Sequence, residues 1–431
     1  MLFPIRAAHA APTGSGATER LRTWSLVALC FAAGAAAAQG AGALSFDRAL
    51  ALAGERAPML EARQASVDAA VQSRTSADQL PDPKLTLGID NLPISGPDRY
   101  SVTRDFMTQR NIGWMQEVPN AAKRAARART ADARTERERA LLHAERLAVR
   151  RDVAQAWLAR WFAERRLALF GTLEDENRLL IDTLPARIAS GKAMPAETTM
   201  ARQEALQLAD RRDELARERA KALASLRRWL GDEAQAPLEG DPPALTVAAT
   251  DLHDQLDGHA DLKAFGPMAE MVRAEASEIE AAKKGDWAWQ VGYSRRGPAY
   301  GDMVSFQFTL ELPLWGEQRQ DPQIAAKRKE VQRIASERED QLRRHREEID
   351  MQLAEHEELT RKLDRLKTSA APLADERVAL ALAAYESARG DLGAVLMARR
   401  ERAELGLRAI DLEAQRYALR AKLNYYVAEQ R

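Results

Sequence analysis

Cysteine is almost missing from this sequence, and so is an excess of charge of either sign. The 431 residues include one cysteine, 64 basic side chains and 64 acidic side chains. A single thiol excludes an internal disulfide framework and a thiolate metal cluster. Because the charges balance, there is no bulk electrostatic attraction to nucleic acid, and we expect no nucleic-acid partner.

Sequence signatures of catalysis are missing as well. There is no nucleophile elbow, phosphate-binding loop, His-Glu-x-x-His zinc pattern or dinucleotide-binding glycine motif. His253 and His259 stand near each other, but we expect them in a helix and turn that open the second half of the chain. His345 and His356 lie eleven residues apart, about three helical turns, which is too far to bind one ion. We therefore predict a protein that is not an enzyme, with no cofactor and no bound metal.

The first 38 residues have the pattern of an export signal. Basic residues precede an apolar run over 24–38, which ends in three alanines and fits a signal peptide (1–38) cleaved near Ala38. Cys30 could instead carry a lipid, although bulky Leu29 precedes it, so lipidation stays open. Beyond this segment no stretch approaches the ~20 apolar residues of a membrane-spanning helix. We expect an exported protein without a helical anchor.

The rest of the chain repeats one order of features, in residues 39–240 and again in residues 241–431. Each half begins with a short helical segment, continues with a β-hairpin of alternating polarity and ends with two long helices. Both hairpins end in Glu-apolar-Pro, and proline ends a strand because it has no amide hydrogen for the ladder. The predicted hairpins span 83–118 and 286–313, and the predicted long helices span 121–188, 195–230, 322–387 and 391–428.

The long helices carry a narrow apolar stripe between dense charges, which is a coiled-coil pattern. At 1.5 Å per residue the first would reach about 100 Å. Pro372 is expected to kink the third. Each helical hairpin turns at a tip of small residues, near Gly191 in the first half and near Gly390 in the second. We predict a mainly α fold with a small β part, built from long antiparallel helical hairpins.

The two β-hairpins each carry one row of large apolar side chains and one row of small or polar ones. Alternating strands of ~10 residues with long loops are typical of outer-membrane barrels. Lipid forbids the open edges of a four-stranded sheet, because every backbone amide must be paired there. Two copies would give eight strands and a filled interior, whereas three would give twelve strands and a lumen. The side chains expected to face lipid are Leu85, Leu87, Ile89, Trp287, Trp289, Phe306 and Phe308.

A soluble β-layer packed on helices is the alternative to this barrel. The export signal and the length of the helices favour the barrel, since a long helical stem attached to a barrel suits a conduit across the periplasm.

In these features the sequence resembles the TolC family of outer-membrane channels, and most closely its CzcC-like branch of heavy-metal efflux components. The resemblance covers residues 44–426, and the assignment to the branch depends mainly on the first hairpin. It is carried by Leu80-Pro81-Asp82-Pro83-Lys84-Leu85, Asp90-Asn91-Leu92-Pro93, Asp105-Phe106-Met107-Thr108 and Met115-Gln116-Glu117-Val118-Pro119, and by the tip sequences 187–191 and 385–400.

This resemblance implies a homotrimer whose twelve-stranded barrel lies in the outer membrane of a Gram-negative bacterium, with a helical tunnel in the periplasm. The protein would be the passive exit duct of a tripartite efflux system for heavy-metal cations. Its helical tips would bind a periplasmic adaptor (a membrane fusion protein), which bridges to a proton-driven inner-membrane pump of the RND type. The residues implied in adaptor docking are Arg187, Gly191, Lys192, Tyr385, Ala388, Arg389 and Gly390.

The sequence departs from the family pattern at the second tip. Ala388 stands where the family usually has glycine, so Gly390 is expected to supply the turn. Many members place acidic side chains just after this tip, but the matching positions here are not acidic. Glu197 and Asp391 are therefore the candidates for an acidic ring at the aperture. Two alternative functions stay open: a channel for drugs or secreted polypeptides, and a periplasmic coiled-coil scaffold without a pore.

Overall fold

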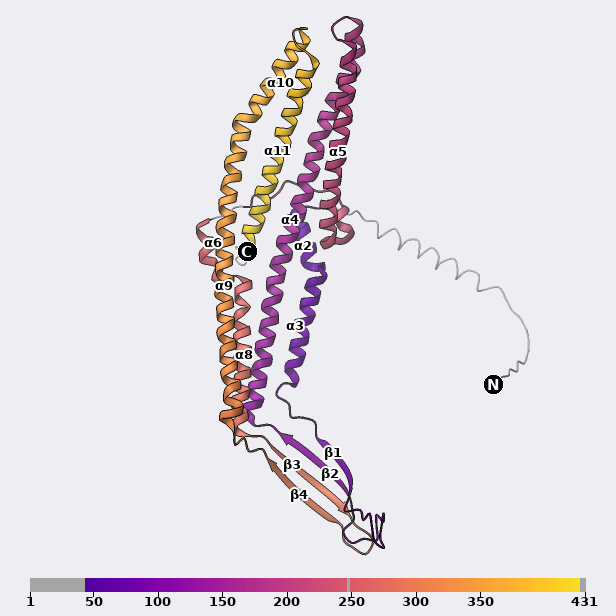
Figure 1. Cartoon of the computed structure of the whole chain (residues 1–431), viewed down its shortest axis with the longest axis vertical. Coiled ribbons are helices and arrows are strands. Elements are labelled where there is room, and N and C mark those ends of the chain that lie inside the picture. Colours follow the sequence, from indigo (N-terminus) through magenta and orange to yellow (C-terminus); the bar gives the residue numbers. More distant parts are fainter. Residues whose placement is uncertain (1–42, 246–248, 427–431) are drawn as a thin grey trace, which may run out of the picture.

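The structure, a computed structural model, describes residues 43–245 and 249–426. The predicted signal peptide (1–38), including Cys30, lies outside the described residues, as do the last positions of the predicted helix 391–428. The described chain forms a long rod with a β-sheet at one end and the tips of two helical hairpins at the other (Figure 1). Any function of the sheet is therefore separated from any function of the tips by the length of the helices.

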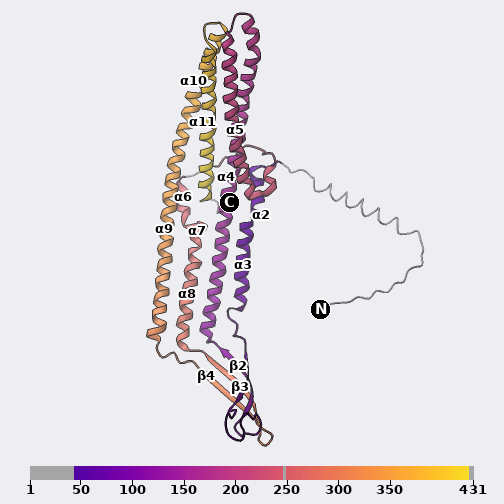
Figure 2. The same cartoon turned by 45° about the vertical axis from the view of Figure 1, so that its right-hand side comes forward.

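Helix α4 (Ala121–Ala189) runs along the whole helical part of the rod (Figures 1 and 2). Its 69 residues correspond to about 100 Å. The helix starts at Asn120, whose side chain accepts a hydrogen bond from the Lys123 amide and so satisfies one of the unpaired first-turn donors. Its neighbours on the sheet side are α3 (Pro58–Ser76) and α8 (Phe265–Ala281), and on the tip side α5 (Pro195–Leu230) and α11 (Leu392–Tyr425).

The predicted helix 322–387 differs from the observed one in two ways. Helix α9 (Gly316–Arg365) already begins at Gly316, and Pro322 lies inside it rather than at its start. Helix α9 then continues through a π-helical turn (Leu366–Ala370) into α10 (Ala371–Glu386). The interruption expected at Pro372 is thus present, because proline has no amide hydrogen for the carbonyl four residues earlier and the turn directly before it widens.

The sheet joins both halves of the chain. Its strands are β1 (Lys84–Asp90), β2 (Gln109–Val118), β3 (Trp287–Arg295) and β4 (Met303–Leu310), antiparallel and in the order β1-β2-β3-β4. Pairing of β2 with β3 links the two predicted hairpins, and β1 and β4 form the two edges. Both hairpins were located correctly, but their pairing with each other could not be read from local alternation.

A polar junction connects the sheet to the helices. The Asp286 carboxylate, just before β3, accepts from the Asn120 amide at 3.0 Å and forms an ion pair with Lys123 at 2.7 Å. Gly285 has φ +67°, and a Cβ there would stand 2.1 Å from the Glu311 carbonyl oxygen. Glycine is needed at this position for both reasons. The junction ties the start of α4 in the first half to the start of β3 in the second.

The core is a string of apolar clusters along the rod, as expected for narrow stripes on long helices. The largest lies near mid-length, where Trp157 packs edge-on against Phe46 and donates to the Leu44 carbonyl. Short elements surround this level: α2 (Phe46–Arg56), η2 (Gly231–Gln235), α6 (Ala249–Gln255), η3 (Leu256–Gly258) and α7 (Ala260–Lys263), with η4 (Ala282–Lys284) nearer the sheet.

Candidate functional site

The four strands place their large apolar side chains on one face of the sheet. In the observed register one row across the strands contains Leu85, Trp114, Val291 and Phe306, and the next contains Leu87, Ile112, Tyr293 and Val304. Trp289 pairs with Phe308, and Trp287 pairs with Leu310, nearer the helices. Ile89 continues this face toward the loops, where its partner is Arg110. All seven side chains that were expected to face lipid therefore share one surface.

This apolar face is open to solvent in the single chain. Leu87 and Phe306 are each 73% exposed and Phe308 is 72% exposed, whereas Trp289 is half-buried. The sheet extends beyond the ends of the helices, so that none of the helices in the described part of the chain packs on the face (Figures 1 and 2). A contiguous apolar surface of this kind marks a contact with lipid or with another protein.

The opposite face of the sheet is polar and tightly packed. Lys84 and Glu117 form an ion pair on it. A Cβ on Gly113 would stand 2.5 Å from the Thr86 hydroxyl oxygen and 2.9 Å from the Gln290 amide nitrogen. The glycine therefore leaves room for polar side chains from both neighbouring strands. The alternation of apolar and polar side chains seen in the sequence is thus in register across all four strands.

The two tips use different residues to reverse the chain. At the first tip Gly191 adopts φ +72°, the left-handed conformation that glycine favours at the end of a helix. At the second tip Ala388 adopts φ +56°, and Gly390 is not among the residues with positive φ. The expectation that Gly390 supplies the turn was wrong. Gly390 instead eases a close approach, since a Cβ there would lie 3.0 Å from the Ala384 Cβ.

A hydrogen bond joins the two tips. The Tyr385 hydroxyl donates to the Glu197 carboxylate at 2.5 Å, and Tyr385 is only 4% exposed. The Arg187 guanidinium lies over the Tyr385 ring, 4.3 Å from its centre, and donates to the Tyr385 carbonyl at 3.3 Å. Burial raises the pKa of Tyr385, and the adjacent Glu197 carboxylate adds to the shift. Tyr385 therefore lies beneath the tip surface, while Gly191, Lys192, Ala388, Arg389 and Gly390 are exposed on it.

Both acidic aperture candidates also cap helices. The Glu197 carboxylate accepts from the Met194 amide at 3.0 Å at the start of α5. The Asp391 carboxylate accepts from the Ala394 amide at 2.9 Å at the start of α11. A negative charge in the first turn of a helix also interacts favourably with the helix dipole.

Ion pairs continue the contact between the two helical hairpins below the tips. Arg400 of α11 contacts Glu204 of α5 and donates to the Gln207 side chain at 2.6 Å. Arg402 of α11 contacts Glu176 of α4 at 2.8 Å. From the sequence these charges could be interpreted only as a solvated helix surface. Their partners are 196 and 226 residues away along the chain, so no local pattern indicates the ion pairs.

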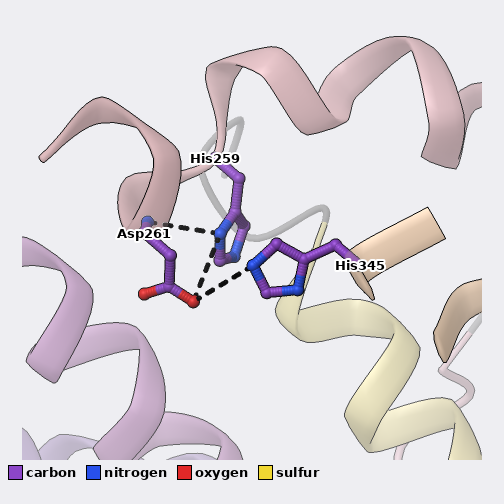
Figure 3. A group of neighbouring side chains, drawn as sticks. All are labelled: His259, Asp261 and His345. Atoms are coloured by element: carbon purple, nitrogen blue, oxygen red, sulfur yellow. Dashed lines mark hydrogen bonds and ion pairs between the residues drawn. The ribbon is translucent and has the colours of Figure 1, made fainter. Parts of the chain in front are cut away.

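A cluster of three side chains near mid-length was missed by the sequence analysis. His259 at the start of α7, Asp261 in its first turn and His345 of α9 point toward one another (Figure 3). His259 and His345 are 1% and 5% exposed. Burial lowers the pKa of His345, although the Asp261 and Glu348 carboxylates act in the opposite direction. Spacing along the chain gave no signal, because the β3–β4 hairpin separates the two histidines.

The other two histidines considered above have partners of their own. His253 contacts Asp350 at 3.0 Å. His356 accepts a hydrogen bond from Arg420 of α11 at 3.0 Å.

No protein-family model matches this sequence, and no curated protein matches it either. Solved structures do. A membrane protein from Pseudomonas aeruginosa matches with TM-score 0.74 at 19% identity, covering 89% of this chain and 90% of that one. CusC, described for its folding and transmembrane channel formation, matches with TM-score 0.75 at 14% identity, covering 89% and 91%. The open MtrE outer membrane channel of Neisseria gonorrhoeae matches with TM-score 0.69 at 15% identity, covering 89% and 88%.

This chain has the fold of those channel proteins. The expected fold, long antiparallel helical hairpins with a small antiparallel sheet, is confirmed over nearly all of the described chain. Among the described residues, none of the helices combines the length and the apolar character that crossing a membrane requires.

Proposed function

We propose that three copies of this chain form a channel in the outer membrane of a Gram-negative bacterium. The observation that carries the proposal is the open, largely apolar face of a sheet whose edge strands are β1 and β4. Such a sheet is stable in lipid when β1 of one copy pairs with β4 of the next, since every backbone group must be paired there. Three copies give twelve strands, enough to leave a lumen lined by the polar face.

In this assembly Leu85, Leu87, Ile89, Trp287, Trp289, Phe306 and Phe308 contact the hydrocarbon. The helical hairpins then extend into the periplasm as a tunnel, and their length is on the order of 100 Å. The protein acts as a passive exit duct, because solute moves through the lumen by diffusion once the periplasmic end is open.

The exposed tip residues are the proposed docking surface for a periplasmic adaptor that bridges to an inner-membrane RND-type pump. Gly191, Lys192, Ala388, Arg389 and Gly390 supply this surface. Arg187 and Tyr385 support it from below, since Tyr385 is buried and bonded to Glu197. Opening of the periplasmic end then requires that the Tyr385–Glu197 bond and the ion pairs below it separate.

Heavy-metal cations are the proposed cargo. The support is the first hairpin and its flanks, where 80–85, 90–93, 105–108 and 115–119 resemble the CzcC-like branch. A strain without this gene should lose tolerance to cobalt, zinc, cadmium, copper or silver and keep its tolerance to dyes and antibiotics. Loss of tolerance to dyes and antibiotics alone would instead identify a channel for drugs.

Conductance tests the channel itself. The purified chain should run as a trimer that dissociates on heating, and it should produce discrete conductance steps in planar bilayers. A monomer that stays dispersed in detergent-free buffer and shows no conductance would establish the periplasmic scaffold instead.

A further inference from the structure

The cluster of His259, Asp261 and His345 has the composition of a metal site. Two imidazoles and one carboxylate are ligands that zinc and related divalent transition metals accept. The residues come from two elements, α7 and α9, and meet in the interior at mid-length of the rod (Figure 3). The Asp261 side chain retains 31% exposure, which gives a route for an ion and for water.

The distances are close to those of a tetrahedral site. The His259 Nδ1 atom lies 3.7 Å from Asp261 Oδ2, and the His345 Nε2 atom lies 3.6 Å from the same oxygen. The three ligand atoms are all within 4.8 Å of one another. Bonds of ~2.0–2.1 Å in a tetrahedron place neighbouring ligand atoms roughly 3.4 Å apart. Small side-chain adjustments are therefore enough to close the three atoms around one ion.

Both facing nitrogens carry lone pairs rather than protons. The Asp261 backbone amide, which can only donate, points at His259 Nδ1 from 3.3 Å. The Gln341 side-chain nitrogen lies 3.1 Å from His345 Nε2, which is then the acceptor. A metal ion needs such lone pairs, and in binding it replaces these two contacts.

The other ring nitrogen of His345 is not one of the atoms that face Asp261. Within the part of the chain that the structure describes, His345 Nδ1 is buried and has no hydrogen-bond partner. Because Nε2 carries the lone pair, Nδ1 carries the ring proton, and a buried donor without an acceptor is costly for a residue with only a structural role.

The surroundings hold the carboxylate in place. The Tyr425 hydroxyl donates to Asp261 Oδ2 at 2.9 Å, and its ring packs edge-on against His259 at 4.7 Å between centres. Hydrogen bonds from an outer layer orient ligating carboxylates in metal sites and tune their affinity. The Arg151 guanidinium stacks on the Tyr425 ring at 4.7 Å and opposes a cation, whereas the nearby Glu348 carboxylate favours one.

We propose that His259, Asp261 and His345 bind one divalent transition-metal ion, zinc being the best match, with water as the fourth ligand. The ion would fasten α7 to α9 beside the end of α11. This is a resident structural site, independent of the channel function and of its cargo.

Titration of the purified full-length chain in detergent, after removal of metal by a chelator, tests the site. Cobalt(II) should bind with one ion per chain and give the intense visible absorption of tetrahedral coordination, and zinc(II) should displace it. His345→Gln and His259→Gln each remove a ligand and should weaken cobalt binding by at least ~100-fold. Tyr425→Phe should weaken it by only about 10-fold, because this variant loses only the hydrogen bond that orients Asp261.

His356→Gln is the matched control, since it removes a histidine from the same helix and should leave cobalt binding unchanged. X-ray absorption of the zinc-loaded wild-type chain should show two imidazoles with oxygen ligands, a result that does not depend on any variant folding. Absence of stoichiometric binding in the wild type, or unchanged binding in both ligand variants, would overturn the site. Conductance measured on the same metal-free preparation tests the channel separately.

Discussion

At the scale of single residues, the two tips solve one backbone problem with different side chains. Gly191 and Ala388 both adopt the left-handed conformation that ends a helix. For an L-residue with a Cβ this conformation costs about 1–2 kcal/mol, because the Cβ approaches the following carbonyl oxygen. The second tip therefore carries strain that the first tip does not.

Exchange of the two residue types should reveal this strain. Ala388→Gly should raise the free energy of local opening at the second tip by about 1 kcal/mol, and Gly191→Ala should lower it at the first tip by a similar amount. Hydrogen exchange of the tip amides measures both, with an expected change of about fivefold in rate. Faster exchange in Ala388→Gly would contradict the account, while the tip that is not mutated serves as the internal control.

His356 should make stability depend on pH. Burial lowers its pKa, and Arg420 and Arg416 lower it further. In the unfolded chain the pKa of His356 has its ordinary value of about 6.5. As pH decreases through this value, the unfolded chain binds a proton that the folded chain excludes, so the free energy of unfolding falls. His356→Gln keeps an acceptor for Arg420 without a titrating group. The drop in apparent unfolding temperature between pH 7.5 and pH 5.5 should become smaller in this variant than in the wild type.

An unchanged drop in His356→Gln would show that other groups cause it.

At the scale of helices and strands, short-range sequence patterns predicted where single elements lie and which face of a strand is apolar. The predicted start of the first long helix at residue 121 agrees with α4, and the alternation in β3 and β4 predicted their apolar face correctly. The pairing of β2 with β3 and the meeting of His259 with His345 depend on how distant segments pack. No spacing rule reports such contacts, so sequence reasoning missed them.

The Tyr385–Glu197 bond should control how firmly the two helical hairpins hold together. Tyr385→Phe keeps the buried ring under Arg187 and removes only the hydroxyl that donates to Glu197. The loss of one hydrogen bond to a charged group corresponds to about 1.5–3 kcal/mol. Tip amides of both hairpins should exchange at least ~10-fold faster, and in planar bilayers the variant should spend more time open.

Tyr417→Phe provides the comparison, since it removes a tyrosine hydroxyl from α11 far from the tips and should leave tip exchange unaltered. Equal exchange in Tyr385→Phe and the wild type would show that the ion pairs below the tips hold the hairpins without this bond.

At the scale of the whole molecule, the two ends of the rod have opposite surface chemistry. The sheet exposes large apolar side chains, while the tips expose mostly small, polar and charged ones. An isolated chain would leave this contiguous apolar face exposed, which soluble monomeric proteins rarely do. Closure of the sheet by copies of itself in lipid removes both the open edges and the exposed surface, which is why assembly and membrane insertion are coupled in the proposal.

Two adjacent residues of β4 test this coupling. Phe306 belongs to the apolar face and Gln307 to the polar face, and both are exposed in the single chain. Phe306→Lys places a charge toward hydrocarbon and should cost about 2–4 kcal/mol near the membrane midplane, so that trimers in the outer-membrane fraction fall more than tenfold. Gln307→Lys should assemble like the wild type and shift the selectivity of the conductance toward anions, because its charge faces the lumen. Normal assembly of Phe306→Lys would show that this face does not contact lipid.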